Sequence, residues 1–304
     1  MMDFSGLFVM QGTLFILMLL GMFLRKKRVI NDGGKTMLSN LVIDVTLPAS
    51  ILKSFEMEFN KEILISCMAV CIAAFLIQAG TAAMSSFLYP GFQVDRKKVL
   101  QYCTICSNAG ILGNPIAEGI FGSVGLLYAA IYCIPQRIFM WTIGLTYFTE
   151  APDKKTLLKK ISTHPCILAV VIGLFLMIFQ ITPPEPLDTT IRTIGNSNTF
   201  LAMILVGTIL AEVRLKDLIS RDTCYYSLIR LFVIPLLVLI GCRIGHAESL
   251  VTGVCVVLSG MPAASTAAVM AAKYQTDEVF ATKCVVFSTL LSMITVPLWC
   301  LFLG

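Results

Sequence analysis

The chain of 304 residues is poor in charge. Only 13% of its residues are charged, whereas soluble domains carry about 25%. Hydrophobic residues make up 57%, and the mean hydropathy is +0.85. This composition excludes an ordinary soluble domain and predicts an integral membrane protein whose first partner is the lipid bilayer. The net charge of +5 does not indicate a nucleic-acid partner, because the basic residues lie in short clusters between apolar runs.

Catalytic and metal-binding motifs are also lacking. There is no G-x-x-x-x-G-K-[ST], so we expect no ATP-driven motor in this chain. Neither H-E-x-x-H nor G-x-S-x-G occurs, and His164 and His246 lie near the ends of apolar segments, where loop or capping roles are expected. The pair Cys103 and Cys106 has no second pair to complete a metal site, so these thiols are expected to pack in a helix. The sequence thus predicts no enzyme, no metal and no cofactor.

What the chain has is long apolar segments. Ten are long enough to cross a bilayer, which takes about 20 helical residues. Their connections are short, so no soluble domain is inserted. The first run continues from Phe4 to Leu24 without a small-residue cleavage site, and we expect it to be a span and not a signal peptide. The predicted spans are 4–24, 36–55, 62–89, 98–120, 123–148, 161–181, 188–211, 222–242, 248–272 and 278–303.

Basic residues are distributed unequally between the loops. The odd-numbered loops hold Arg25, Lys26, Lys27, Arg28, Lys35, Arg96, Lys97, Lys98, Lys154, Lys155, Lys159, Lys160, Arg214, Lys216, Arg221 and Lys273. The even-numbered loops hold only Lys53, Lys61, Arg192 and Arg243. Because cytoplasmic loops carry the excess of Lys and Arg, this pattern places both termini outside the cell membrane.

The two halves match each other. Five spans precede the central basic loop and five follow it, so the second half enters the membrane from the opposite side. That is an inverted repeat, with residues 1–150 as the first five-helix unit and 151–304 as the second. The fold class predicted is an all-α membrane protein of ten helices.

Corresponding spans of the two halves are interrupted. The fourth carries two glycines, two asparagines and a proline within residues 108–115 and is interrupted at Gly110–Pro115, and the ninth is interrupted at Ser259–Pro262. A plain proline kink is the alternative, since Gly and Pro are common in membrane helices. Paired interruptions favour broken helices 4 and 9, because such breaks mark the binding sites of secondary transporters.

Half-helices that begin after Pro115 and Pro262 would point free amides and positive dipole ends at the break, which suits an anion. Asparagine and serine side chains there can donate hydrogen bonds. The hydroxyls of Ser265 and Thr266 are expected instead to bond carbonyls of their own helix. The predicted substrate-binding residues are Ser107, Asn108, Asn114, Pro115, Arg137, Arg230, Met261 and Pro262.

Two arginines and two carboxylates within apolar runs are candidates for function. Arg137 and Arg230 must face the protein interior, because arginine at the bilayer centre costs at least about 2.5 kcal/mol. They bind an anionic substrate, or they form structural ion pairs with Asp44 or Glu118. These two carboxylates are the candidates for coupling to H⁺ or Na⁺. The alternatives are an ion pair for Asp44 and an interfacial position for Glu118.

The run Ser107–Gly122, SNAGILGNPIAEGIFG, resembles the signature of the auxin efflux carrier family, which includes plant PIN-FORMED exporters and bacterial malate-permease-like transporters. The resemblance covers essentially the whole chain, with further similarity at 45–49, 230–235, 261–264 and 287–297. It implies two inverted five-helix repeats. In these, helices 1, 2, 6 and 7 form a scaffold and helices 3–5 and 8–10 a mobile transport domain.

The resemblance also implies that helices 4 and 9 cross at Pro115 and Pro262, and that the substrate-contacting asparagine is Asn108. Transport would follow elevator-like alternating access, often in a homodimer. The sequence departs from the pattern at Glu118, where relatives have a basic residue, and at Phe200, where a proline is common. It also lacks the long central loop of many plant members.

These observations predict a secondary transporter of small organic anions, such as malate or a related dicarboxylate, in the cell membrane. An exporter of amino acids or auxin-like weak acids is the alternative within transport. A channel or a membrane sensor is the alternative from another class. The sequence does not choose the substrate, the coupling ion or the direction of transport.

Overall fold

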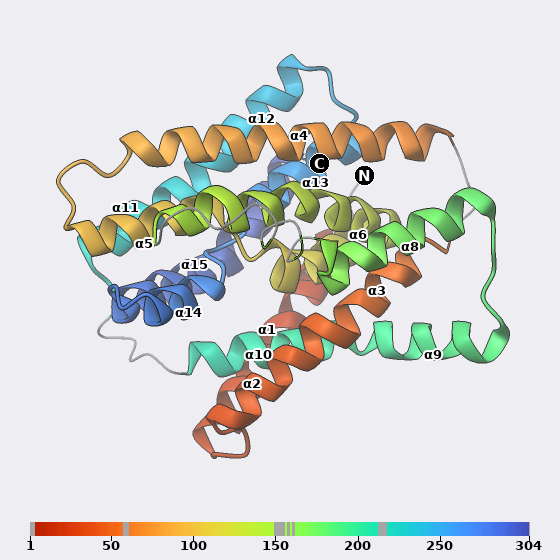
Figure 1. Cartoon of the computed structure of the whole chain (residues 1–304), viewed down its shortest axis with the longest axis horizontal. Helices are drawn as coiled ribbons and strands as arrows, with labels where there is room; N and C mark the ends of the chain where they lie inside the picture. The colour runs from red at the N-terminus through yellow and green to blue at the C-terminus, as the bar shows by residue number, and fades with distance from the viewer. Residues whose placement is uncertain are drawn as a thin grey trace. The chain divides into compact units, whose positions relative to one another are not determined.

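A computed structural model describes residues 4–56, 61–148, 156, 159, 162–211 and 218–303. Within these ranges every regular element is a helix (Figure 1). The loop lysines and arginines at Lys154, Lys155, Lys160, Arg214 and Lys216, used above for orientation, lie outside the described residues.

The elements follow the hydrophobic segments of the sequence. In chain order they are α1 (Phe4–Lys26), α2 (Asp32–Leu41), the π-helical turn η1 (Val42–Thr46), α3 (Leu47–Ser54), α4 (Lys61–Phe87), α5 (Val94–Ile105), η2 (Ala109–Gly113), α6 (Asn114–Phe139), η3 (Met140–Gly144), α8 (Pro165–Phe179), α9 (Glu185–Asn196), α10 (Asn198–Leu210), α11 (Arg221–Leu228), η5 (Ile229–Val233), α12 (Ile234–Ile244), α13 (Ser249–Ser259), α14 (Thr266–Lys273) and α15 (Glu278–Leu303).

Five described segments are long and apolar enough to cross a membrane: Lys61–Phe87, Ala109–Gly144, Glu185–Leu210, Arg221–Ile244 and Glu278–Leu303. The apolar helices Pro165–Phe179 and Ser249–Ser259 are shorter. The prediction of an all-helical membrane protein is therefore confirmed, while its division into ten spans and inverted repeats stays a prediction. The boundary expected between the fourth and fifth spans coincides with a kink at Gly122, whose φ of 68° is a conformation that glycine adopts without strain.

The chain folds into two compact units that alternate along the sequence. Unit 1 comprises Met1–Met68, Gly110–Ile131 and Ser162–Glu212, and unit 2 comprises Ala69–Ala109, Tyr132–Ile161 and Val213–Gly304. The units therefore cut across the two predicted sequence repeats, because each takes segments from both halves of the chain.

Unit 1 is built on a close approach of α1 and α10. Gly21 lies against the backbone of Ile204, and Gly207 lies against the carbonyl of Met18. A Cβ at either glycine would collide with backbone of the other helix, so only glycine permits this contact. On the other side of the unit, α3 packs against both α8 and α9.

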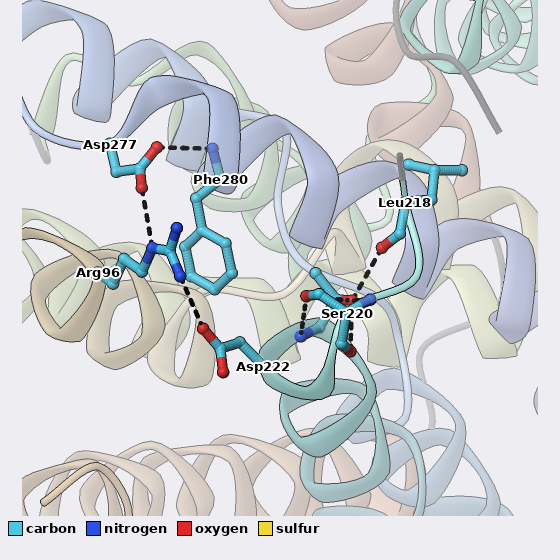
Figure 2. A network of polar contacts seen from close by, with 7 residues as sticks. Arg96, Leu218, Ser220, Asp222, Asp277 and Phe280 are labelled. Atoms are coloured by element: carbon cyan, nitrogen blue, oxygen red, sulfur yellow. Dashed lines mark hydrogen bonds and ion pairs between the residues drawn. The ribbon is translucent and has the colours of Figure 1, made fainter. Parts of the chain in front are cut away.

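In unit 2, α14 and α15 run beside each other (Figure 1), and α5, α11 and α15 begin at one end of the unit. Figure 2 shows Arg96 between two carboxylates there: its Nη1 is 2.9 Å from Asp222 Oδ2, and its Nε is 3.1 Å from Asp277 Oδ2. The guanidinium also lies over the ring of Phe280, 5.1 Å from its centroid. The Asp277 hydrogen bond is the main cause that raises the pKa of Arg96. This cluster ties the starts of three helices together.

Candidate functional site

The first break lies between α5 and α6. Helix α5 ends at Ile105, and Cys106 takes an extended conformation with φ −100° and ψ 101°. Ser107 and Asn108 are not helical, and the chain then passes through η2 before α6 begins at Asn114. The discontinuous helix predicted at this position is therefore observed, and a plain proline kink is not.

The second break lies between α13 and α14. Helix α13 ends at Ser259, and Gly260 caps it. Met261 and Pro262 are not helical, and α14 begins at Thr266. The second predicted interruption is thus also a break in a helix.

The two breaks pair with each other in unit 2 through an antiparallel bridge between Ser107 and Ala263. The amide of Asn108 donates to the carbonyl of Pro262 at 2.8 Å, and the amide of Ala264 donates to the carbonyl of Cys106 at 3.1 Å. We call this arrangement the crossing. Pairing satisfies backbone groups that would otherwise be stranded in an apolar interior. The expectation that amides after Pro262 stay free for a ligand is therefore wrong for Ala264.

Arg230, on the π-helical turn η5, donates hydrogen bonds to backbone carbonyls at the two breaks. Because the Asn108 amide turns to Pro262, the Thr104 carbonyl loses its partner in the helix. Arg230 Nη1 donates to that carbonyl at 2.8 Å, and Nε donates to the Met261 carbonyl at 2.9 Å. One turn earlier, the Tyr226 hydroxyl donates to the carbonyl of Cys103 at 3.0 Å. A cation at the end of α5 also complements the negative end of the helix dipole.

Each break also has one buried polar side chain from a later helix. Gln136 Nε2 donates to the Ser107 carbonyl at 2.5 Å, and Gln136 Oε1 accepts from the Ser107 hydroxyl at 3.3 Å. At the second break the Ser288 hydroxyl accepts from the Ala263 amide at 3.1 Å. The hydroxyl of Ser107 is therefore engaged in holding the first break.

The side-chain amide of Asn108 is different. Asn108 is only 6% exposed, yet its side chain has no hydrogen-bond partner among the residues that the structure describes. Over the same ranges Arg230 Nη2 has no partner either, and no carboxylate pairs with this guanidinium. The hydroxyl of Tyr132 is buried and also has no hydrogen-bond partner among the described residues. Unit 2 thus holds buried donors that a polar ligand can use.

The predicted site residues divide between the two units. Ser107, Asn108, Met261, Pro262 and Arg230 are buried in unit 2 around the crossing. Arg137, also in unit 2, is half-buried near the end of α6. The expected role of Pro262 at the crossing is observed.

Asn114 and Pro115 belong to unit 1, where they form the buried first turn of α6. The backbone pairs of the crossing involve Cys106 and Asn108, and the expectation that Pro115 also marks the crossing stays a prediction. A proline restarts a helix well because its missing amide is not needed in the first turn.

The two acidic candidates have different surroundings in unit 1. Glu118 Oε1 is 2.9 Å from Lys53 Nζ, which also contacts Asn196 Oδ1 at 3.0 Å. Arginine was therefore the wrong partner to expect for Glu118. Asp44 is exposed on η1 and has no ion pair among the described residues, so the expected salt bridge to a neighbour is not observed.

Sequence reasoning missed several residues of the crossing. Tyr226 lies one turn from Arg230, and Gln136 directly precedes Arg137, so polar side chains inside apolar spans were the available signal. The Thr266 hydroxyl was expected to bond within its own helix, but it accepts from Tyr102 at 3.2 Å. Nothing in the sequence marks Thr104, whose contribution is a backbone carbonyl.

A second polar cluster lies in unit 1, where α3 ends and α9 begins. Arg192 Nη2 is 2.7 Å from Glu56 Oε2, and Arg192 Nε is 2.9 Å from Asp188 Oδ2. Burial raises the pKa of Glu56, and its hydrogen bond with Asp188 raises it further. We call Lys53, Glu56, Glu118, Asp188 and Arg192 the charged end of unit 1.

Two helices that break within apolar segments and pair at their breaks are an architecture of membrane transporters. The family described as membrane transport proteins matches residues 12–159 and 151–300, nearly the whole chain. The chain belongs to this family, the auxin efflux carrier family whose signature Ser107–Gly122 resembles.

Relatives are transporters by name. An uncharacterized transporter of Methanothermobacter thermautotrophicus is 26% identical over 290 residues, covering 94% of this chain and 95% of the relative. The uncharacterized transporter YfdV of Escherichia coli K12 is 24% identical, with 93% of each chain covered. A third, from Methanocaldococcus jannaschii, is 23% identical and covers 93% and 94%.

Proposed function

We propose that this membrane transport protein is a secondary active transporter of small organic anions, such as malate or a related dicarboxylate. The observation that carries the proposal is Arg230, a guanidinium 2% exposed beside the crossing and without a carboxylate partner among the described residues. An uncompensated buried cation favours a negative ligand, because the attraction is strong where water is excluded.

Unused donors support the same substrate class. Asn108 and Arg230 are buried residues of unit 2, and the Tyr132 hydroxyl is a buried atom there. Carboxylates accept hydrogen bonds from neutral amides and hydroxyls as well as from guanidinium groups. In this proposal Asn108 contacts the substrate directly, and Arg230 contributes charge while it holds the crossing.

Elevator-type alternating access is supported by the division into two compact units. Unit 1 contains α1–α3 and α8–α10, the helices of the predicted first, second, sixth and seventh spans, and it also contains Gly110–Ile131 of the predicted fourth and fifth spans, so the division agrees with the proposed scaffold only in part. Unit 2 contains the crossing together with α5 and α11–α15. Movement of one unit as a rigid body would carry a bound anion without dismantling its site.

Coupling to H⁺ or Na⁺ is proposed at Asp44 in preference to Glu118. Asp44 is exposed on a π-helical turn, an irregularity that often marks functional positions, whereas Glu118 is engaged by Lys53.

The proposal also places the protein in the cell membrane, with both termini outside, as a homodimer. The Arg96 cluster supports placing the third, seventh and ninth loops on one side of the membrane, since it gathers their ends.

The test is uptake of labelled dicarboxylates into proteoliposomes. Uptake should be saturable, and Asn108→Ala should weaken it about tenfold or more, because a hydrogen bond to a charged ligand is lost. Asn40→Ala, the same change at an exposed position on α2, is the matched control and should leave uptake intact.

Three results would overturn this proposal. Unsaturable uptake with large single-channel currents would indicate a channel. Competition by amino acids or auxin-like acids, but not by dicarboxylates, would support the weak-acid exporter. Equal uptake by the Asn108→Ala and Asn40→Ala variants would remove Asn108 from the site.

A further inference from the structure

Unit 1 contains a cavity of 490 Å³ where α3 and α8 end and α9 begins. Its volume lies in the range of about 300–1,000 Å³ that small-molecule sites occupy. Leu52, Phe55, Met177 and Ile191 contribute an apolar wall. The cavity is separate in sequence from the crossing and shares no residue with it.

The cavity is also lined by acidic residues. They are Glu56, Glu185 and Asp188, and one basic residue, Arg192, lies among them. Arg192 bridges Glu56 and Asp188 at 2.7 and 2.9 Å, so a single guanidinium serves two partly buried carboxylates while Glu185 adds a third. Carboxylates therefore outnumber cations in the lining, and a cationic group with several donors would balance them.

Arg192 can also receive an anion. Its Nη2 contacts Glu56 and its Nε contacts Asp188, while Nη1 has no partner among the described residues. A guanidinium presents five N–H donors in a fixed plane and suits phosphate. The cavity therefore offers a place for a cation and, beside it, a place for a phosphate.

The position of the cavity indicates that the ligand also has an apolar part. Helix α8 is apolar throughout Pro165–Phe179, and the cavity lies just past its end, next to Gln180 and Pro183. In a membrane protein the ends of apolar helices lie at the level of the lipid headgroups. A cavity lined by both charged and apolar residues at that level fits an amphiphile.

We propose that this cavity binds a phospholipid with an ethanolamine headgroup. The primary ammonium lies beside the carboxylates of Glu56, Asp188 and Glu185, the phosphate accepts from Arg192 Nη1, and an acyl chain follows the apolar wall. A primary ammonium has three donors and no acceptor, which matches adjacent carboxylates. A choline headgroup has no N–H to donate, and a glycerol headgroup has no cation.

The test uses purified, delipidated protein in detergent. Thermal stabilisation is titrated with dioleoyl phosphatidylethanolamine, phosphatidylcholine and phosphatidylglycerol, and native mass spectrometry counts the lipid retained. The ethanolamine lipid should bind about tenfold more tightly than the choline lipid, because charge-assisted hydrogen bonds are lost in the latter. Glu56→Gln and Asp188→Asn should each reduce this preference. Asp95→Asn, which neutralises an exposed carboxylate paired with Lys98 in unit 2, should not.

Equal binding of the ethanolamine and choline lipids by the wild-type protein would overturn the proposal, and so would an unchanged preference in both cavity variants. If those variants do not fold, the wild-type comparison decides alone. Soluble phosphoethanolamine is the last arm. Protection by it at the same concentration as the lipid would show that the site takes a water-soluble zwitterion, and the lipid assignment would be wrong.

Discussion

The crossing in unit 2 and the charged end of unit 1 both contain an arginine, but the two side chains bond to different partners. Arg230 is 2% exposed and donates to the backbone carbonyls of Thr104 and Met261. Arg192 has a side chain 54% exposed and contacts the carboxylates of Glu56 and Asp188. The buried cation replaces hydrogen bonds that broken helices have lost, whereas the exposed one balances charge.

This difference predicts where substitutions are costly. A carbonyl left without a donor in an apolar interior destabilises the fold by the full free energy of its desolvation. An exposed ion pair contributes little to stability. The crossing should therefore tolerate few changes at its polar side chains. The charged end should respond mainly to pH and to ligands.

The largest effect is expected for Arg230→Gln. Two carbonyls lose their charged donor at about 1–3 kcal/mol each, so the variant should unfold at a much lower temperature than the wild type in detergent. Arg230→Lys should recover only part of the loss, because one ammonium cannot reproduce the planar fork. Arg192→Gln is the matched control and should change the unfolding temperature little. Equal losses at the two arginines would contradict the comparison.

An intermediate effect is expected for the side chains that serve the two breaks. Gln136→Leu leaves the Ser107 carbonyl without its donor, and Ser288→Ala leaves the Ala263 amide without its acceptor. Each should cost about 1–3 kcal/mol of stability, measured by thermal unfolding. If the breaks are equivalent halves of one crossing, the two losses should be similar. A loss at only one of them would show that a single break depends on side-chain support.

The sequence was sufficient to predict the all-helical class and the two breaks but not the contacts that the helices make. Apolar length predicts α15 at residues 278–303, because a lipid-embedded helix must satisfy its own backbone. The breaks near Asn108 and Pro262 follow from local residue types in the same way. The acceptors of Arg230 are backbone carbonyls that become available only when two distant segments pair, and no residue type marks them. The Lys53 partner of Glu118 was likewise hidden, because sequence separation does not show which helix ends meet.

The smallest effect is expected from titration of the charged end. Burial, followed by hydrogen bonding with Asp188, raises the pKa of Glu56 above its ordinary value of 4.5. The folded chain then holds more protons than the unfolded chain at pH values between 4.5 and the raised pKa. This contribution to stability is full below pH 4.5 and is lost as pH rises through the folded pKa.

The unfolding temperature of the wild type should thus fall by a small amount as pH increases across that window. Glu56→Gln should flatten the profile while Asp95→Asn leaves it unchanged, and a wild-type profile that instead rises across the window would mean that Glu56 is stabilised in its charged form.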